Sequence, residues 1–361
     1  MPTRADILAR AAALRDRFER AGAVPVETPV LQPAETLLDL YGEDIRARAY
    51  LTSDALRGEQ VLRPDFTVPV VQMHMAQGAE PARYTYSGEV FRRQEHDPER
   101  ANEYIQVGYE VFDRTDPAGA DAEVFALFAE VLAPLNLRAA TGDIGILMAA
   151  VRGLSTTEAR RAALMRHIWR PRRFRALLDR FSGKTPPPPS RTALLAAAEP
   201  FAGTSPEIGM RSRDEVEQRI AALRADAEAP ALDGQELSAL AALLKVRETA
   251  PYALEQLRDI AVDLPSITPA LDRLQARIDA LAAHGIDVEQ LDFEANYGRT
   301  SMEYYDGFVF GFYAERMPNQ PPVATGGRYD ALTRHLGRNA EIPAVGGVLR
   351  PGLMLELEAM A

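Results

Sequence analysis

The sequence predicts an α+β fold in which a sheet-containing core is interrupted by a long helical insertion. Residues 1–140 mix helix and strand signals, whereas residues 141–285 are rich in Ala, Leu, Arg and Glu in a helical pattern. Strand signals return near the C-terminus in a β-forming run made of Phe308, Val309, Phe310, Phe312 and Tyr313. We therefore expect one core built from residues 1–140 and 286–361, with residues 141–285 inserted into it.

The chain is expected to begin with a helix. Thr3 is a suitable N-cap, because its hydroxyl can accept a hydrogen bond from the first turn. A buried stripe follows at helical spacing and consists of Ile7, Ala11, Leu14 and Phe18. Arginines that alternate with Ala and Leu also suggest a transit peptide, but such peptides are poor in acids. The helix is favoured by the acidic residues Asp6, Asp16 and Glu19.

A long antiparallel hairpin is expected between Arg83 and Phe112, because two strand-like stretches flank a charged turn over residues 94–102. Side chains alternate between the two faces of a strand. On the second strand, one face is apolar and consists of Ile105, Val107, Tyr109 and Val111, and the other presents Gln106, Gly108 and Glu110. The amide of Gln106, the space left by the missing side chain of Gly108 and the carboxylate of Glu110 can together hold a small ligand with hydrogen-bond donors, such as an imidazole or an amine. The alternative is an ordinary solvent-facing side of a strand.

Two further segments place polar groups beside predicted elements. In residues 61–67, a strand ends at Pro64, and Asp65 and Thr67 precede a helix, where they can act as caps or receive a ligand ammonium. Tyr304 and Tyr305 stand before the predicted C-terminal strand, and residues 324–330 (Ala-Thr-Gly-Gly-Arg-Tyr-Asp) indicate a tight turn with a polar cluster. Each segment taken alone is also compatible with capping or core packing.

The insertion has two distinctive features. Residues 186–189 are all proline, which cannot lie inside a helix and therefore predicts a stiff loop. A group of arginines surrounds Trp169 and consists of Arg166, Arg170, Arg172, Arg173 and Arg175. Such a group can bind nucleic acid, but it is more often a solvated helix face paired with acids, which we favour.

The composition narrows the classes of function. The 361 residues contain no cysteine, which excludes disulfides and thiolate chemistry, and only five scattered histidines, which argues against a metal site. No apolar run approaches the roughly 18 residues that a membrane span needs. The formal net charge of −11 lowers the expectation of a nucleic-acid partner, because phosphate binding requires basic surface. We expect a cytoplasmic protein without a metal, a cofactor, a membrane anchor or a nucleic-acid partner.

In order along the chain, these segments resemble the histidyl-tRNA synthetases. Residues 27–30 (Glu-Thr-Pro-Val) resemble the first class II synthetase motif, which forms the dimer interface in that family, and residues 91–94 (Phe-Arg-Arg-Gln) resemble the second. The segments that resemble the histidine-binding stretches of the family are residues 62–67, 106–110, 302–305 and 326–330. The resemblance implies the class II fold, an antiparallel sheet flanked by helices.

Carried over to this chain, the resemblance implies a histidine site. Asp65 and Thr67 would receive the ammonium group of histidine, and Arg92 would face its carboxylate. The imidazole would be contacted by Gln106, Glu110 and one or both of Tyr304 and Tyr305. No catalytic residue and no metal ligand is expected.

The sequence departs from the synthetases where adenylate chemistry needs cations. Synthetases place an arginine before the Tyr-Tyr signature and another in the third motif, where positive charge stabilises the reacting phosphorus centre. Here the first position is Thr300, with Arg299 displaced by one residue, and the second is Leu353. Gln94 replaces a glutamate of the second motif, and the chain ends at Ala361, where synthetases continue into an anticodon-binding domain. We expect histidine activation and tRNA recognition to be lost.

A histidine pocket without phosphate chemistry resembles the regulatory subunits of ATP phosphoribosyltransferase, a family of synthetase paralogues. That resemblance implies a homodimer, without catalytic activity of its own, that joins a short-form catalytic subunit in the first step of histidine biosynthesis. It also implies feedback inhibition by histidine. Two alternatives remain: a truncated ATP-dependent ligase that activates histidine, and a histidine sensor that needs no catalytic partner.

Overall fold

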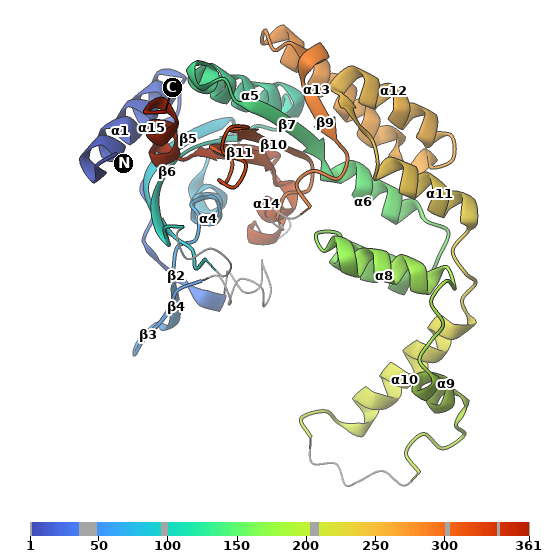
Figure 1. The fold of residues 1–361 in the computed structure, drawn as a ribbon. Helices are drawn as coiled ribbons and strands as arrows, with labels where there is room; N and C mark the ends of the chain where they lie inside the picture. Colours follow the sequence, from blue (N-terminus) through green and yellow to red (C-terminus); the bar gives the residue numbers. More distant parts are fainter. Residues whose placement is uncertain are drawn as a thin grey trace.

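The computed structural model describes residues 2–35, 49–94, 100–202, 209–299, 304–337 and 340–360. Its described residues form a large sheet with the strand order β1-β5-β6-β12-β11-β10-β7-β9-β8 (Figure 1). Neighbouring strands from β5 to β7 run antiparallel, whereas β1 is parallel to β5 and β7 is parallel to β9. The strands are β1 (Val24–Pro25), β5 (Ala82–Phe91), β6 (Glu103–Phe112), β7 (Arg138–Asp143), β8 (Arg247–Thr249), β9 (Asp292–Glu294), β10 (Phe308–Tyr313), β11 (Ala324–Arg328) and β12 (Ala344–Leu349).

The strand order shows how the two parts of the core join. β7 precedes the helical segment in the sequence and β10 follows it, yet the two pair along their whole length, from Phe308 opposite Asp143 to Tyr313 opposite Arg138. β12, which is close to the C-terminus, pairs with β6 of the hairpin. The predicted α+β fold with an antiparallel central sheet is therefore confirmed.

Helices cover both faces of the sheet, so both faces of its central strands are buried (Figure 1). The predicted apolar face of β6 packs in one core cluster with α1, α5 and α15. The opposite face of the hairpin packs in a second cluster that contains α4 and parts of α6, α12, α13 and α14. The helices of the two core parts are α1 (Arg4–Arg20), α4 (Thr67–Gln77), α5 (Pro117–Leu132), α14 (Asp330–Leu336) and α15 (Pro351–Glu358), with 3-10 turns at η1 (Ala133–Leu135) and η3 (Val288–Gln290).

The first helix begins where the capping signal predicts. The Thr3 hydroxyl accepts a hydrogen bond from the Asp6 amide at 3.2 Å, and the Asp6 carboxylate accepts one from the Thr3 amide at 2.9 Å. This reciprocal pair is a capping box. Of the predicted stripe, Ala11, Leu14 and Phe18 are buried and Ile7 is partly buried.

Residues 141–285 are mainly helical, apart from the last three residues of β7 and the short strand β8. The proline run separates α8 from α9, and its last member, Pro189, begins α9, a position where the missing amide donor costs nothing. α9 and α10 extend away from the sheet, whereas α13 packs beside α5 (Figure 1). The boundaries of the predicted insertion stay a prediction. Its helices are α6 (Ile144–Gly153), α7 (Glu158–Arg166), α8 (Pro171–Phe181), α9 (Pro189–Ala196), α10 (Arg213–Glu228), α11 (Gly234–Leu243), α12 (Ala250–Ala261), η2 (Pro265–Ile267) and α13 (Thr268–Ala283).

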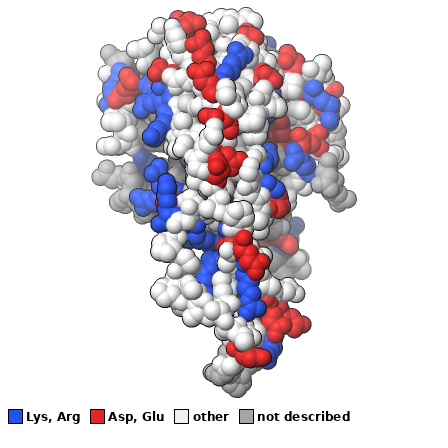
Figure 2. Space-filling view, turned by 90° about the vertical axis from the view of Figure 1, so that its right-hand side faces the viewer, with Lys and Arg blue, Asp and Glu red and all other residues white. Residues whose placement is uncertain are grey.

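The arginines around Trp169 lie at the end of α7 and in α8. Arg166, Arg172, Arg173 and Arg175 are exposed, and none of them pairs with an acid among the described residues. These four arginines form a solvated face, as the sequence favours, but the described part of the chain supplies no acidic partner for them. Figure 2 shows charges of both signs on one side of the molecule, with basic side chains gathered at its mid-height.

A small second sheet projects from the core. Its order is β2-β4-β3, and its strands are β2 (Leu31–Pro33), β3 (Leu51–Asp54) and β4 (Gly58–Leu62). β4 leads through Pro64 into α4, as the sequence predicts. Across the described parts of the chain, no helix has the length and apolar character needed to cross a membrane.

Candidate ligand site

Glu110 of β6 is the centre of a buried hydrogen-bond cluster. Its Oε1 accepts bonds from the Thr67 hydroxyl at 3.0 Å and from the Tyr86 hydroxyl at 2.7 Å, and its Oε2 accepts one from the Tyr329 hydroxyl at 2.6 Å. Burial raises the pKa of Glu110 to about 7, while the three hydroxyl donors act in the opposite direction. Because these donors use much of its acceptor capacity, Glu110 mainly holds the surrounding side chains in place.

Two glycines make room for this cluster. Gly346 of β12 lies opposite Glu110, and a Cβ atom on Gly346 would stand 1.5 Å from Glu110 Oε2. Gly108 lies opposite Tyr86, and a Cβ atom there would stand 2.0 Å from Tyr86 Cζ. The gap that the sequence shows at Gly108 is therefore filled by the ring of Tyr86 and not by a ligand.

Gln106 lies on the same face of β6 as Glu110 and is fully buried. Neither its amide nitrogen nor its amide oxygen has a hydrogen-bond partner among the described residues. An unpaired buried polar group costs about 1–3 kcal/mol, so such groups are rare without a reason. A bound molecule that offers both a donor and an acceptor, as a neutral imidazole does, would satisfy this amide.

Tyr304 and Tyr305 line the same region and are buried. Their ring centroids are 4.8 Å apart, and the ring of Tyr304 lies 6.1 Å from that of Tyr329. Burial raises the pKa of both phenols; the Tyr304 phenol also faces Asp65, Thr67 and Glu110, and the Tyr305 phenol also faces Glu110, Asp65 and Arg92. The neighbouring signature positions Thr300, Met302 and Glu303 lie outside the described residues.

Asp65, Thr67 and Arg92 reach this region from the start of α4 and the end of β5. Asp65 is buried and directly precedes Phe66, the N-cap residue of α4, and its Oδ1 accepts a long bond of 3.4 Å from the Val68 amide. Thr67 is the first residue of α4 and donates to Glu110 instead of capping. Arg92 Nε donates to the Pro64 carbonyl at 2.7 Å, which places the guanidinium beside the segment that carries Asp65.

Six of the predicted site residues thus lie around one region, and two further tyrosines complete it: Asp65, Thr67, Arg92, Glu110, Tyr304 and Tyr305. Gln106 lies on the same face of β6, four residues before Glu110. Tyr86 and Tyr329 were not predicted as site residues. Tyr329 belongs to the Gly-Gly-Arg-Tyr-Asp segment of residues 326–330, and Tyr86 stands opposite Gly108 in the hairpin register. Both signals were available in the sequence, but neither says that the hydroxyl reaches Glu110.

The arginine nearest to the Tyr-Tyr signature points elsewhere. Arg299 is buried, and it donates from Nε to the Ile168 carbonyl at 2.7 Å and from Nη1 to Asn296 Oδ1 at 2.8 Å. Burial lowers its pKa to about 10, and Arg175 adds to this effect. Arg299 is therefore engaged with the helical segment.

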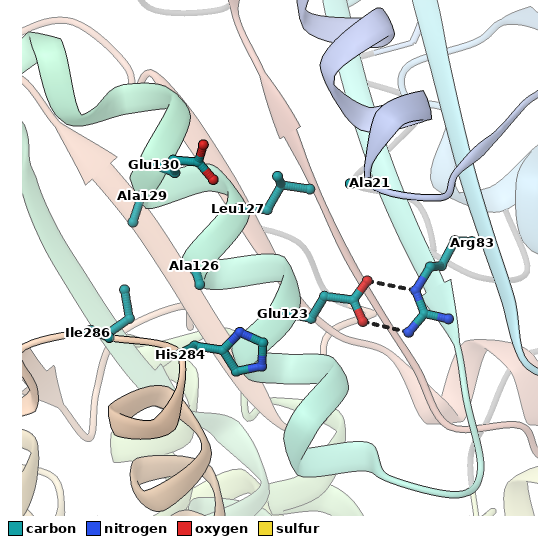
Figure 3. Close-up of a pocket in the computed structure, with 10 residues that line it drawn as sticks. Ala21, Arg83, Glu123, Ala126, Leu127, Ala129, Glu130, His284 and Ile286 are labelled. Carbon is teal, nitrogen blue, oxygen red and sulfur yellow. Dashed lines mark hydrogen bonds and ion pairs between the residues drawn. The ribbon is translucent and has the colours of Figure 1, made fainter.

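A separate surface cavity of about 740 Å³ lies on the other side of the sheet, between α1, α5 and the end of α13 (Figure 3). Two of its charged groups pair with each other, because Arg83 binds Glu123 through two bonds of 2.7 and 2.6 Å, and Glu130 pairs with Arg17. Glu123 also accepts a bond from the Tyr109 hydroxyl at 2.5 Å. None of the predicted site residues lines this cavity. In the described ranges, no three His, Cys, Asp or Glu residues are grouped to hold a metal ion.

Comparisons with known proteins agree with this architecture. A family model described as histidyl-tRNA synthetase matches residues 2–208 and 202–351. The structure of an ATP phosphoribosyltransferase regulatory subunit/histidyl-tRNA synthetase from Bacillus halodurans has a TM-score of 0.69 at 22% identity and covers 99% of this chain and 80% of that chain. Histidyl-tRNA synthetase from Nostoc sp. PCC 7120 has a TM-score of 0.64 at 16% identity and covers 98% of this chain and 72% of that chain. The fold is that of the class II histidyl-tRNA synthetases, as predicted.

Sequence relatives narrow this class. ATP phosphoribosyltransferase regulatory subunits from Brucella anthropi and Mesorhizobium japonicum are 31% and 32% identical to this chain. The matches cover 92% and 93% of this chain and 93% and 94% of those proteins. The chain belongs to the family of ATP phosphoribosyltransferase regulatory subunits.

Proposed function

We propose that this chain supports a short-form ATP phosphoribosyltransferase catalytic subunit in the first step of histidine biosynthesis, and that it mediates feedback inhibition by histidine. The observation that carries this proposal is its match to named regulatory subunits over more than 90% of both lengths. The chain acts as a cytoplasmic homodimer within a hetero-oligomer, has no catalysis of its own and needs no nucleic acid.

The buried amide of Gln106 supports a ligand in the pocket. In the proposed complex, Gln106 pairs with the imidazole, and Tyr304 and Tyr305 enclose the ring. Asp65 and Thr67 receive the ammonium group, and Arg92 faces the carboxylate. Glu110 acts through the hydroxyls that it holds, since three of them already bind its oxygens.

Feedback inhibition requires that histidine distinguish two states of the complex. A ligand shifts an equilibrium only by the difference between its affinities for the two states. The pocket must therefore differ between the active and the inhibited complex, and histidine must bind the inhibited one more tightly.

Calorimetric titration with histidine, of the chain alone and mixed with the short-form catalytic subunit, tests the proposal. We expect the two proteins to associate, the mixture to bind histidine, and the chain alone to show no ATP–pyrophosphate exchange. Exchange in the isolated chain would instead identify a histidine-activating ligase. Histidine binding without association would identify a stand-alone sensor.

The substitution Gln106→Leu separates a ligand role from a structural one. Leucine is close to glutamine in size and removes two unpaired buried polar atoms, so we expect the free energy of unfolding to stay the same or to rise by about 1 kcal/mol. Histidine affinity should fall by about tenfold or more, because the imidazole loses its partner. Calorimetry and urea unfolding measure the two effects. A variant that binds histidine as well as the wild type would exclude Gln106 from the site.

A further inference from the structure

A buried arginine of α13 joins three parts of the fold. Arg277 donates from Nε to Asp121 Oδ2 of α5 at 2.7 Å and from Nη1 to Asp143 Oδ2 at 2.8 Å. Asp143 ends β7 and caps α6, because its Oδ1 accepts a bond from the Gly145 amide at 2.8 Å. The side chains of Arg277, Asp121 and Asp143 are only 5%, 2% and 5% exposed, so these bonds are shielded from water.

Asp121 also connects Arg277 to the candidate pocket, through Arg328. The other oxygen of Asp121, Oδ1, accepts a bond from Arg328 Nη2 at 2.7 Å. Arg328 also binds Asp330 at 3.0 Å, so the residues on both sides of Tyr329 are fixed by one ion pair. Tyr329 in turn donates to Glu110. An unbroken series of direct bonds and one peptide link therefore runs from Arg277 through Asp121, Arg328 and Tyr329 to Glu110.

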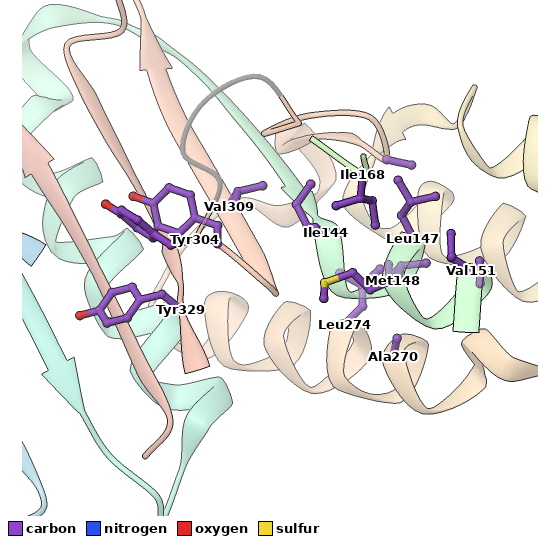
Figure 4. Close-up of a cluster of buried hydrophobic side chains, with 14 of the residues drawn as sticks. Ile144, Leu147, Met148, Val151, Ile168, Ala270, Leu274, Tyr304, Val309 and Tyr329 are labelled. Atoms are coloured by element: carbon purple, nitrogen blue, oxygen red, sulfur yellow. The ribbon is translucent and has the colours of Figure 1, made fainter. Parts of the chain in front are cut away.

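Apolar packing also connects α6 and α13 to the tyrosines of the pocket. Figure 4 shows Tyr304 and Tyr329 in one buried cluster with Ile144, Leu147 and Met148 of α6 and with Ala270 and Leu274 of α13. A shift of α13 or α6 would thus act on the pocket through both the ion pairs and the packed side chains. Close-packed interiors transmit such strain instead of absorbing it.

We propose that Arg277 is a positioning residue for the ligand pocket, which sets the place of Tyr329 against Glu110 through Asp121 and Arg328. The helical segment of residues 141–285, which contains α13, thereby controls the affinity of the pocket for its ligand. The identity of the ligand rests on the proposed function, whereas the link between Arg277 and Glu110 does not.

A double-mutant cycle on histidine affinity tests the link. Arg277→Met and Tyr329→Phe should each weaken binding about tenfold, and the double variant should be no weaker than the worse single variant, because both act through one contact. If the fold-losses of histidine affinity in the two single variants multiply in the double variant, the two residues act independently and the proposal is overturned. Arg277→Lys, which keeps the positive charge, should restore part of the affinity.

Arg160→Met is the matched control. Arg160 lies in α7 and forms another shielded ion pair, with its Nε 2.7 Å from Asp226 Oδ1 and side chains 8% and 18% exposed. Its loss removes a comparable interaction without touching the series that leads to Glu110. Histidine affinity should stay within about twofold of the wild type in this variant. An equal loss in both variants would mean that affinity follows general stability.

A readout without ligand separates failure of this inference from failure of the proposed function. Glu110 faces the hydroxyls of Thr67, Tyr86 and Tyr329, and the carboxylate of Asp65. The Tyr329 bond lowers its pKa, so loosening that bond should raise it. In 13C-glutamate NMR titrations, Arg277→Met should shift the Glu110 titration to higher pH, and Arg160→Met should not. If the wild type binds no histidine but this shift occurs, the link stands and only the ligand is wrong; if no shift occurs, the link is wrong.

Discussion

Glu110 combines deep burial with three neutral donors, and this combination decides how it ionises. Hydrogen bonds to the charged form lower a carboxyl pKa, and burial raises it. Here burial has the larger effect, and the pKa rises from 4.5 to about 7. Near neutral pH the pocket therefore holds a carboxyl that changes charge easily, and its hydrogen-bond donors among the described residues, Thr67, Tyr86 and Tyr329, are all uncharged hydroxyls.

The raised pKa predicts a particular pH dependence of stability. Between pH 4.5 and about 7 the folded protein keeps a proton on Glu110 that the unfolded chain has lost. Raising the pH through this range must then lower the free energy of unfolding, by on the order of 3 kcal/mol from this group, with no further change above it. In Glu110→Gln this component is absent, so its stability should fall less steeply with pH than that of the wild type.

Urea unfolding at several pH values between 5 and 8 measures how steeply the free energy of unfolding falls with pH in the wild type and in Glu110→Gln. Glu130→Gln is the control, because Glu130 is exposed on α5 and pairs with Arg17 at the surface. That variant should keep the wild-type slope. Identical slopes in Glu110→Gln and the wild type would show that Glu110 titrates normally.

At the scale of elements, the pocket depends on how closely β6 and β12 approach. Gly346 faces Glu110 across this strand pair, and the carboxylate occupies the volume that a side chain on β12 would need. The hydroxyl of Tyr329 reaches the same carboxylate oxygen. Strand spacing and hydrogen bonding are thus coupled at a single position.

Gly346→Ala should therefore damage both stability and the site. Its Cβ would lie 1.5 Å from Glu110 Oε2, so the strands or the carboxylate must move, at a cost of about 1–3 kcal/mol. Gly234→Ala is the matched control, because a Cβ at that first residue of α11 meets no atom within 4 Å. Urea unfolding should separate the two variants. If the two variants have the same free energy of unfolding, the close approach of β6 and β12 does not contribute to stability.

The hairpin also shows what the sequence can and cannot predict. Alternation of apolar and polar residues predicted the strand over residues 103–112 and both of its faces, because the side-chain period of a strand is fixed. The contact of Tyr86 with Gly108 needed the register of the hairpin. The ion pairs of Arg277 could not be predicted at all, since they join residues 134 and 156 positions apart that share no periodic pattern.

At the scale of the whole molecule, apolar side chains are exposed in and beside the segment of residues 27–30 that resembles the first synthetase motif. Val24, Val30 and Leu31 are 57%, 39% and 48% exposed in the single chain. Val24 belongs to β1, which ends the large sheet within the described residues and pairs only with β5 there. An apolar edge strand is a template for association, so natural proteins rarely leave one uncovered. The proposed homodimer would cover it with a second copy of the chain.

This arrangement predicts that a charge in the segment separates the two copies. Burying an unpaired carboxylate in an interface is costly, so Val24→Glu or Val30→Glu should convert a dimer into a monomer at micromolar concentration. Because both side chains are already exposed in the single chain, folding should be unaffected. Sedimentation equilibrium measures the mass, and circular dichroism checks the fold.

Val262→Glu introduces the same charge at a site that is 82% exposed, just beyond α12, and should leave the dimer intact. If both kinds of variant keep the wild-type mass of two chains, the interface lies on another surface. If the wild type itself sediments as one chain, the exposed segment must be covered by something other than a second copy. In that case the short-form catalytic subunit is the first candidate, and the mass of the mixture with Val24→Glu, compared with the wild-type mixture, decides it.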